Sequence, residues 1–366
     1  MKINLKTTNK ILFYIAYFFF LLYAFFGTIN IFEKPLKLLT NISIIMIFLS
    51  FIFNIKKYNY NELIKLIFCL SLSLVYIIKT GNYVFLKLIL IIIVSKNIEI
   101  EKRILFDIKF RIIFLILMFL LCKIGVATDN IAYFHETIRH SIGFSNPNVF
   151  GMHMFILCLE LLYIYRKKLS FFKMFNILLI MIVSNVYSGS RTSLYVFILS
   201  LILFALYRYK DDIFQNKFVK FIIIWSPLIT SLIIYILYKF YINGSNFGIQ
   251  VDKILSGRLL NTKFFSTNYP INIFGSNIAE ANKSCDITAA YMLYAFGISG
   301  LCIYLFSFVK LIKKLYKRND LALVLIVFSL IIYGVSEKLW LFADCNILIT
   351  VLSVLIFNVR NEEKKE

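Results

Sequence analysis

The sequence predicts an all-α, polytopic integral membrane protein that forms one domain over residues 1–366. Of its 366 residues, 60% are hydrophobic and 17% are aromatic, and the mean hydropathy is +0.82. A soluble domain could not bury so much apolar surface. Apolar runs of about 20 residues recur along the whole chain, separated by short polar segments, as in helices that cross a bilayer.

About twelve apolar runs are predicted to be membrane spans. The first follows Lys2, Lys6 and Lys10 as in a signal peptide, but no small-residue cleavage site follows it, so we expect it to remain a span. The fourth run is short and would be tilted, re-entrant or joined to its neighbour, in which case the total is eleven. The runs cover residues 11–29, 38–55, 62–79, 83–96, 107–126, 149–166, 172–188, 193–209, 221–240, 287–309, 321–335 and 343–358.

The basic residues predict the orientation of these spans. The formal net charge is +21, and lysine and arginine cluster in alternate connections, so by the positive-inside rule both termini are cytoplasmic. In a soluble protein this charge would suggest nucleic acid, but here the basic residues flank spans, so no nucleic-acid partner is expected. Three segments are then external: 127–148, 188–193 and a large loop, 241–286, between the ninth and tenth spans.

The six cysteines lie mostly within apolar runs and show no paired spacing. The sequence therefore predicts neither a disulfide framework nor a metal site, and no cofactor is expected. The chain also contains no nucleotide-binding motif, which argues against a pump driven by ATP.

Three arginines on the predicted external face are the strongest indication of function. Arg191 lies in the turn Ser188-Gly189-Ser190-Arg191-Thr192-Ser193, between two spans, while Arg139 and Arg258 lie in the other two external segments. Planar, permanently charged guanidinium groups suit phosphate or diphosphate. A small, hydroxyl-rich turn that includes Ser190, placed at a helix start, would let an anion approach backbone amides. Snorkelling of Arg191 to the membrane interface is the structural alternative.

The segment before the sixth span combines charge with turn residues. Arg139 and His140 precede Gly143-Phe144-Ser145-Asn146-Pro147-Asn148, and Asn146-Pro147 predicts a turn that caps the following helix. A helix-entry turn that contacts lipid headgroups is as good an explanation as a binding site, although the titratable imidazole beside a fixed cation favours function. His153, inside the span, stays unassigned.

A general base must come from few groups on this face. His140 is nearest in sequence to the basic cluster, and Glu337 is the other residue we consider, although it could simply pair with Lys338. The external acidic residues include Asp129, Glu136, Glu280, Asp286 and Glu337. Most of them are expected to be ordinary solvated carboxylates.

The order and spacing of four short segments resemble the Wzy-type polymerases of O-antigen and capsular polysaccharide, which are relatives of the O-antigen ligases. The resemblance covers the whole architecture. Its sharper parts are Gly143 to Asn148 with Gly151, Ser188 to Thr192, Ser256-Gly257-Arg258, and Asp286 through Tyr291 to Gly297-Ile298-Ser299-Gly300.

This resemblance implies a metal-independent glycosyltransferase at the outer face of the bacterial cytoplasmic membrane. Its substrates would be undecaprenyl-diphosphate-linked oligosaccharides, and its partners membrane lipid, a flippase and a chain-length regulator. By carry-over, Arg191, Arg258 and His140 are the candidate catalytic residues. The candidate substrate-binding residues are Arg139, Asn146, Asn148, Ser190, Asp286 and Glu337. Two alternatives stay open: a ligase that moves glycan to another acceptor, and a flippase or other secondary transporter, which would carry its charges at the membrane midplane.

Overall fold

The computed structural model describes residues 5–134, 137–279, 281–338 and 342–357. Within these ranges, eight helices are long and apolar enough to cross a membrane, and the protein is an all-α, multi-pass membrane protein. These eight helices are α1 (Leu5–Phe26), α2 (Asn30–Phe53), α3 (Tyr60–Thr80), α6 (Pro147–Tyr165), α7 (Phe171–Ser188), α8 (Arg191–Tyr209), α9 (Lys217–Ile242) and α12 (Thr288–Lys317).

The other helical segments are shorter or more polar. Apolar but short are α4 (Val84–Val94), α13 (Leu321–Tyr333) and the ten-residue segment formed by η5 (Ile347–Leu352) and α14 (Ser353–Ile356). Helix α5 (Ile100–Lys123) is long enough to span but carries charged residues through its first half. Three single-turn 3-10 helices, η1 (Ile55–Lys57), η2 (Arg166–Lys168) and η3 (Asp211–Gln215), follow α2, α6 and α8. The expected count of twelve spans stays a prediction.

Two regions differ from the expected pattern. The loop 241–286 contains two helices, α10 (Asn246–Ile254) and α11 (Arg258–Asn268), because Ser245 caps the first and the Asp252 carboxylate accepts the Leu259 amide at the start of the second. Residues 127–148 contain an unexpected antiparallel hairpin of β1 (Ala132–Phe134) and β2 (Thr137–Arg139).

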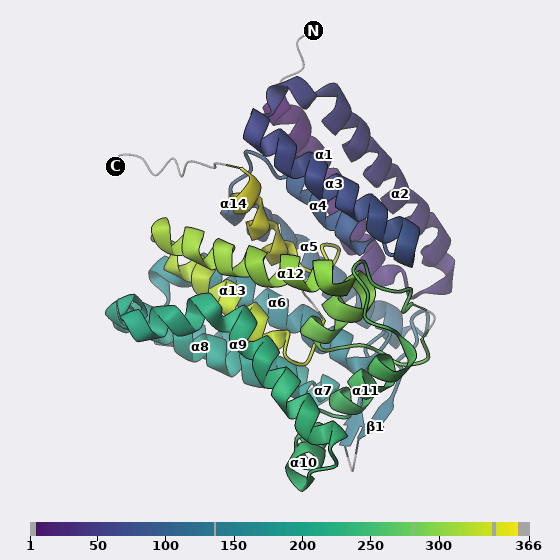
Figure 1. Cartoon of the computed structure of the whole chain (residues 1–366), viewed down its shortest axis with the longest axis vertical. Coiled ribbons are helices and arrows are strands. Elements are labelled where there is room, and N and C mark those ends of the chain that lie inside the picture. The colour runs from purple at the N-terminus through teal and green to yellow at the C-terminus, as the bar shows by residue number, and fades with distance from the viewer. Residues whose placement is uncertain (1–4, 135–136, 280, 339–341, 358–366) are drawn as a thin grey trace.

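The helices pack around one continuous apolar core. Helices α1 to α4 form one side of the bundle and α8 and α9 the other, while α12 runs between them (Figure 1). Helix α1 packs against α2, α4 and α5, α6 packs against α7 and α8, and α13 packs against α8 and α12. The apolar core joins buried side chains from both sides, such as Phe20 of α1 and Phe197 of α8.

The connections alternate between two ends of the bundle. At one end, the Lys96 ammonium lies over the rings of Tyr58 and Phe357, with centroid distances of 4.3 and 5.4 Å. At the other end, the Thr28 hydroxyl donates to the Gly143 carbonyl and the Asn82 amide donates to the Tyr291 hydroxyl. Figure 1 shows the start of α1 and α14 away from β1 and α10. We call the end with β1 and α10 the arginine end.

A break in α12 fixes the large loop at the arginine end. Gly297 interrupts the helix with a φ of +72°, and its backbone lies against that of Ile273. The amides of Ile298 and Ser299 then donate to the carbonyls of Asn272 and Ile273. A side chain at position 297 would both strain the left-handed backbone and collide with the loop.

Candidate functional site

The turn between α7 and α8 sets the position of the first arginines. Gly189 ends α7 in the left-handed conformation, and a side chain there would meet that of Arg139, which runs alongside. The His140 amide donates to the Tyr187 carbonyl at 2.8 Å and so ties the β2 end to this turn. Arg191 becomes the first residue of α8, where the positive end of the helix dipole favours an anion.

Three arginines from distant parts of the chain converge at this turn. Arg139, Arg191 and Arg258 line one small pocket of about 60 Å³, which we call the arginine pocket. Burial lowers the pKa of Arg139, and the charges of Arg191 and Arg258 lower it further, so the three groups repel one another. Arg191 Nη2 also donates to Ser256 Oγ at 3.1 Å, which links α8 to the large loop. Such a concentration of positive charge suits a polyanionic group.

Arg258 is bound to a carboxylate. Its side chain is only 9% exposed, forms an ion pair with Glu337, and donates to the carbonyls of Ser336 and Leu255. The bonds to Ser336 and Glu337 join the start of α11 to the segment after α13. Arg258 therefore holds the position and charge of Glu337 as well as lining the arginine pocket.

Glu337 has the protonation properties of a general base. Burial raises the pKa of Glu337 to about 7, although the Arg258 guanidinium opposes the shift and the charge of Asp286 adds to it. A carboxyl group that titrates near neutral pH can accept a proton from a hydroxyl and release it afterwards. The ion pair of Glu337 is with Arg258, while Lys338, the alternative partner that the sequence offered, contacts Ser284 Oγ through Nζ at 3.2 Å and lies over the Tyr291 ring.

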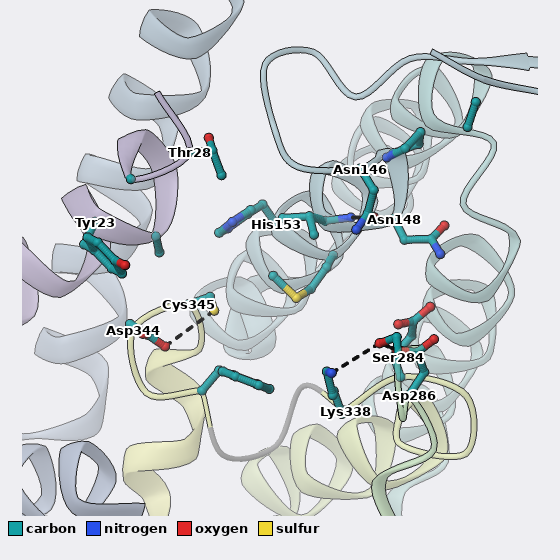
Figure 2. Close-up of a pocket in the computed structure, with 18 of the residues that line it drawn as sticks. Tyr23, Thr28, Asn146, Asn148, His153, Ser284, Asp286, Lys338, Asp344 and Cys345 are labelled. Atoms are coloured by element: carbon teal, nitrogen blue, oxygen red, sulfur yellow. Dashed lines mark hydrogen bonds between the residues drawn. The ribbon is translucent and has the colours of Figure 1, made fainter. Parts of the chain in front are cut away.

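A cavity of about 640 Å³, the first cavity, adjoins the arginine pocket, and Arg139 and Asn148 line both. Its size is typical of small-molecule sites. In Figure 2, Asn148, Asp286 and Lys338 lie on one side, and Tyr23 and Thr28 on the other. Five predicted residues line it: Arg139, Asn146, Asn148, Asp286 and Glu337.

Comparison with known proteins gives a clear result. No protein-family model, curated protein or solved structure matches the chain.

Asn146 and Ser190 have largely structural contacts. Asn146 Oδ1 caps α6 by accepting the Val149 amide at 3.1 Å, as its sequence context predicts. Ser190 is buried, where it shares a hydrogen bond with Ser193 Oγ and packs against Gly151. Ser190 therefore shapes the turn from beneath and lines neither the first cavity nor the arginine pocket.

His140 lies apart from the first cavity. Its Nδ1 pairs with Asp129 at 2.6 Å, and both side chains are about one-third exposed. Although partial burial opposes ionisation, hydrogen bonds from His140 and the Ile142 amide lower the pKa of Asp129. His140 lines neither the first cavity nor the arginine pocket, so Glu337 is the better placed base. Glu136 and Glu280 lie outside the described residues.

A buried polar cluster beneath the first cavity was not predicted. Arg111 of α5 donates through two nitrogens to Asp107 Oδ2, at 2.8 and 2.6 Å, and through Nη1 to His153 Nδ1 at 2.7 Å. The Tyr17 hydroxyl donates to Asp107 Oδ1, and Glu160 lies 3.8 Å from Arg111. The cluster thus joins α1, α5 and α6.

The sequence contained a signal for this cluster. Asp107 and Arg111 are four residues apart, so they share one face of a helix, and Glu160 stands alone in an apolar run. Charged residues inside predicted spans normally face one another. Of these residues, His153 also lines the first cavity. Since an arginine can only donate, His153 Nδ1 must accept, and the ring proton lies on Nε2.

Removal of the Arg111 charge should strongly destabilise the bundle. Arg111→Met leaves Asp107 and Glu160 buried without their cation, which costs about 3–5 kcal/mol for a buried pair. We expect a large fall in the thermal unfolding midpoint of the purified protein in detergent. Lys109→Met, which alters an exposed residue of the same helix, is the control and should leave the midpoint unchanged. Equal midpoints for both variants would contradict a stabilising role.

Proposed function

We propose that this protein polymerises undecaprenyl-diphosphate-linked oligosaccharide repeat units into a surface polysaccharide by glycosyl transfer. One observation carries the proposal: three guanidinium groups converge beside a cavity that also contains a carboxyl group with a pKa near 7. The first arrangement suits a diphosphate leaving group, and the second suits proton transfer from a hydroxyl. The resemblance of Ser188 to Thr192 and of Ser256 to Arg258 to the polymerases supports the same reaction.

In the proposed step, an acceptor hydroxyl oxygen attacks the anomeric carbon of the donor sugar. The bond from that carbon to the diphosphate oxygen breaks, and the electron pair leaves with the lipid diphosphate, whose charge is neutralised by Arg139 and Arg191. The hydroxyl proton passes to the Glu337 carboxylate. A single displacement of this kind inverts the configuration at the anomeric carbon. Arg258 keeps the carboxylate in place through its ion pair.

We further propose that the arginine end faces the outside of the bacterial cytoplasmic membrane. On this hypothesis the chain crosses twelve times, both termini are cytoplasmic, and residues 241–286 are the large external loop. The alternation of connections between two ends supports this topology. The basic segments with Lys56, Lys96 and Arg166 lie at the end opposite the arginines, as the positive-inside rule requires.

The proposed substrates also define the partners. The polyprenyl tails of donor and acceptor would remain in lipid between helices, and a flippase would deliver the repeat units. A chain-length regulator would be a further partner. A ligase uses the same donor chemistry and differs only in its acceptor.

A transporter of lipid-linked oligosaccharide is the second candidate, and two observations favour it. Asp107, Arg111 and Glu160 are buried within the bundle, which is where a transporter carries charge. The break in α12 at Gly297 is also a feature of transporter helices.

Cells that lack the protein provide the test. We expect single lipid-linked repeat units to accumulate, detected by mass spectrometry, and to be cleaved by an impermeant glycosidase because they lie on the outer face. Repeat units protected inside would instead establish a transporter, and long lipid-linked polymer would establish a ligase. Re-expression of the wild-type chain is the control and should restore polymer.

A further inference from the structure

A second cavity, of about 650 Å³, lies next to the first. Its walls come from the turn after α3, the end of the large loop and the start of α12. Ser284, Lys338 and Phe342 line both cavities, so they form the wall that the two share. The second cavity thus lies at the arginine end, beside the proposed donor site. Neither the donor diphosphate nor the proposed base Glu337 occupies it.

The lining of the second cavity consists mainly of neutral hydrogen-bonding groups and aromatic rings. No carboxylate is among the described residues that line it, and its only charged groups are Lys283 and Lys338. Amide and hydroxyl groups both donate and accept, as a polyhydroxylated ligand requires. The polar and aromatic members include Thr80, Asn82, Tyr83, Asn277, Asn282 and Tyr291.

Two of these groups, Asn82 and Tyr291, are held in place before any ligand binds. Asn82 Nδ2 donates to the Tyr291 hydroxyl at 3.0 Å, while Asn82 Oδ1 accepts the Val84 amide and so begins α4. Tyr83 is 55% exposed, so its ring face is available for stacking. A preorganised wall of this kind reduces the entropic cost of binding. The arginine pocket, with its three cations, suits an anion, whereas the second cavity suits a neutral sugar.

The shared wall joins the second cavity to the reacting groups. Lys338 Nζ contacts Ser284 Oγ at 3.2 Å and lies 5.2 Å from the centre of the Tyr291 ring, while Ser284 Oγ donates to Asp286. Lys338 directly follows Glu337, the proposed base. A sugar in the second cavity therefore lies next to the first cavity, whose lining includes the proposed base Glu337.

We propose that the second cavity binds the non-reducing sugar of the acceptor, and that Asn82 and Asn282 bind its hydroxyl groups. This inference rests on the proposed glycosyl transfer and names the site of its second substrate. In the step itself the acceptor oxygen bonds to the donor's anomeric carbon, its proton passes to Glu337, and the diphosphate leaves with the electron pair. Donor and acceptor thus occupy adjacent cavities whose linings share Ser284, Lys338 and Phe342.

Binding of a lipid-free repeat-unit oligosaccharide tests this site. Saturation-transfer NMR on the full chain in lipid nanodiscs should detect binding to the wild type. Asn82→Ala and Asn282→Ala should each weaken binding about 3- to 10-fold, the usual effect of losing one hydrogen bond. Asn243→Ala, an exposed asparagine at the end of α9, is the control and should bind normally. Because Asn282 is exposed, Asn282→Ala tests binding even if Asn82→Ala, which removes the hydrogen bond to the Val84 amide at the start of α4, does not fold.

The outcomes separate this inference from the proposed function. Normal binding to Asn282→Ala together with loss in Asn148→Ala would place the sugar in the first cavity and overturn the inference. Displacement of the oligosaccharide by millimolar inorganic phosphate would identify the second cavity as an anion site through its lysines and would also overturn it. If the cellular test indicates a transporter while Asn282→Ala still weakens binding, the polymerase proposal fails but the sugar site stands.

Discussion

Glu337→Gln is expected to lower polymer synthesis about 10²–10⁴-fold, the usual contribution of a general base. Glutamine keeps the shape of the side chain and an oxygen that can accept from Arg258, but it cannot take a proton from the acceptor. The measurement is polymer formed per minute by purified protein in nanodiscs with lipid-linked repeat units. Asp129→Asn is the matched control because Asp129 pairs with His140 away from the first cavity. Full activity in Glu337→Gln would exclude Glu337 as the base.

The pH dependence of the wild type follows from the same carboxyl group. The pKa of Glu337 is about 7 and the carboxylate is the active form, so activity should rise as pH increases through 7. Because folding raises this pKa from 4.5, the protonated group stabilises the folded state fully below 4.5, and this contribution is lost as pH rises from there through 7. The wild type should therefore lose thermal stability relative to Glu337→Gln over the same range. A wild-type profile without a step near 7 would contradict the assignment.

Arg191→Ala is expected to lower polymer synthesis about 10²–10³-fold. This is the usual effect of removing one preorganised hydrogen-bond donor that stabilises a developing anion. Arg191 begins α8 and lies in the arginine pocket, where it would contact the diphosphate as the glycosidic bond breaks. Arg191→Lys should recover part of the activity because lysine keeps the charge but not the planar donor pair. The assay is the polymer synthesis used for Glu337.

The control for this variant lies on the same helix. Arg208→Ala removes an exposed arginine from the opposite end of α8 and should leave activity unchanged. Arg258→Ala is a less direct test, because it also leaves Glu337 buried without its cation. Wild-type activity in Arg191→Ala would overturn the proposed diphosphate site.

Several features of the site follow from local sequence signals. Asn146-Pro147 predicts the start of α6, and the Asn146 cap confirms it. The positions of the three arginines relative to the apolar runs predict that they share one face, and all three line the arginine pocket. The first inference depends only on neighbouring residues and the second on the alternation of spans. Both can be read directly from the order of residues in the sequence.

Other features depend on contacts between distant residues. Arg258 and Glu337 are 79 positions apart, and only their packing shows that they form a pair and that the pKa of the carboxyl rises. Sequence proximity favoured His140 as the base, but its imidazole pairs with Asp129 instead. The cluster of Arg111 and His153 was missed for the same reason, since it joins residues 42 positions apart.

The sequence by itself determined that this is an all-α membrane protein, because hydropathy sums over consecutive residues and needs no knowledge of packing. It also predicted that Arg139, Arg191 and Arg258 share one face of the membrane. Only the tertiary structure decided which of them share a cavity, which carboxyl group is buried beside a cation, and that a second cavity adjoins the first. Burial, ion pairing and cavity shape arise where helices distant in sequence meet, and a pKa responds to that three-dimensional environment.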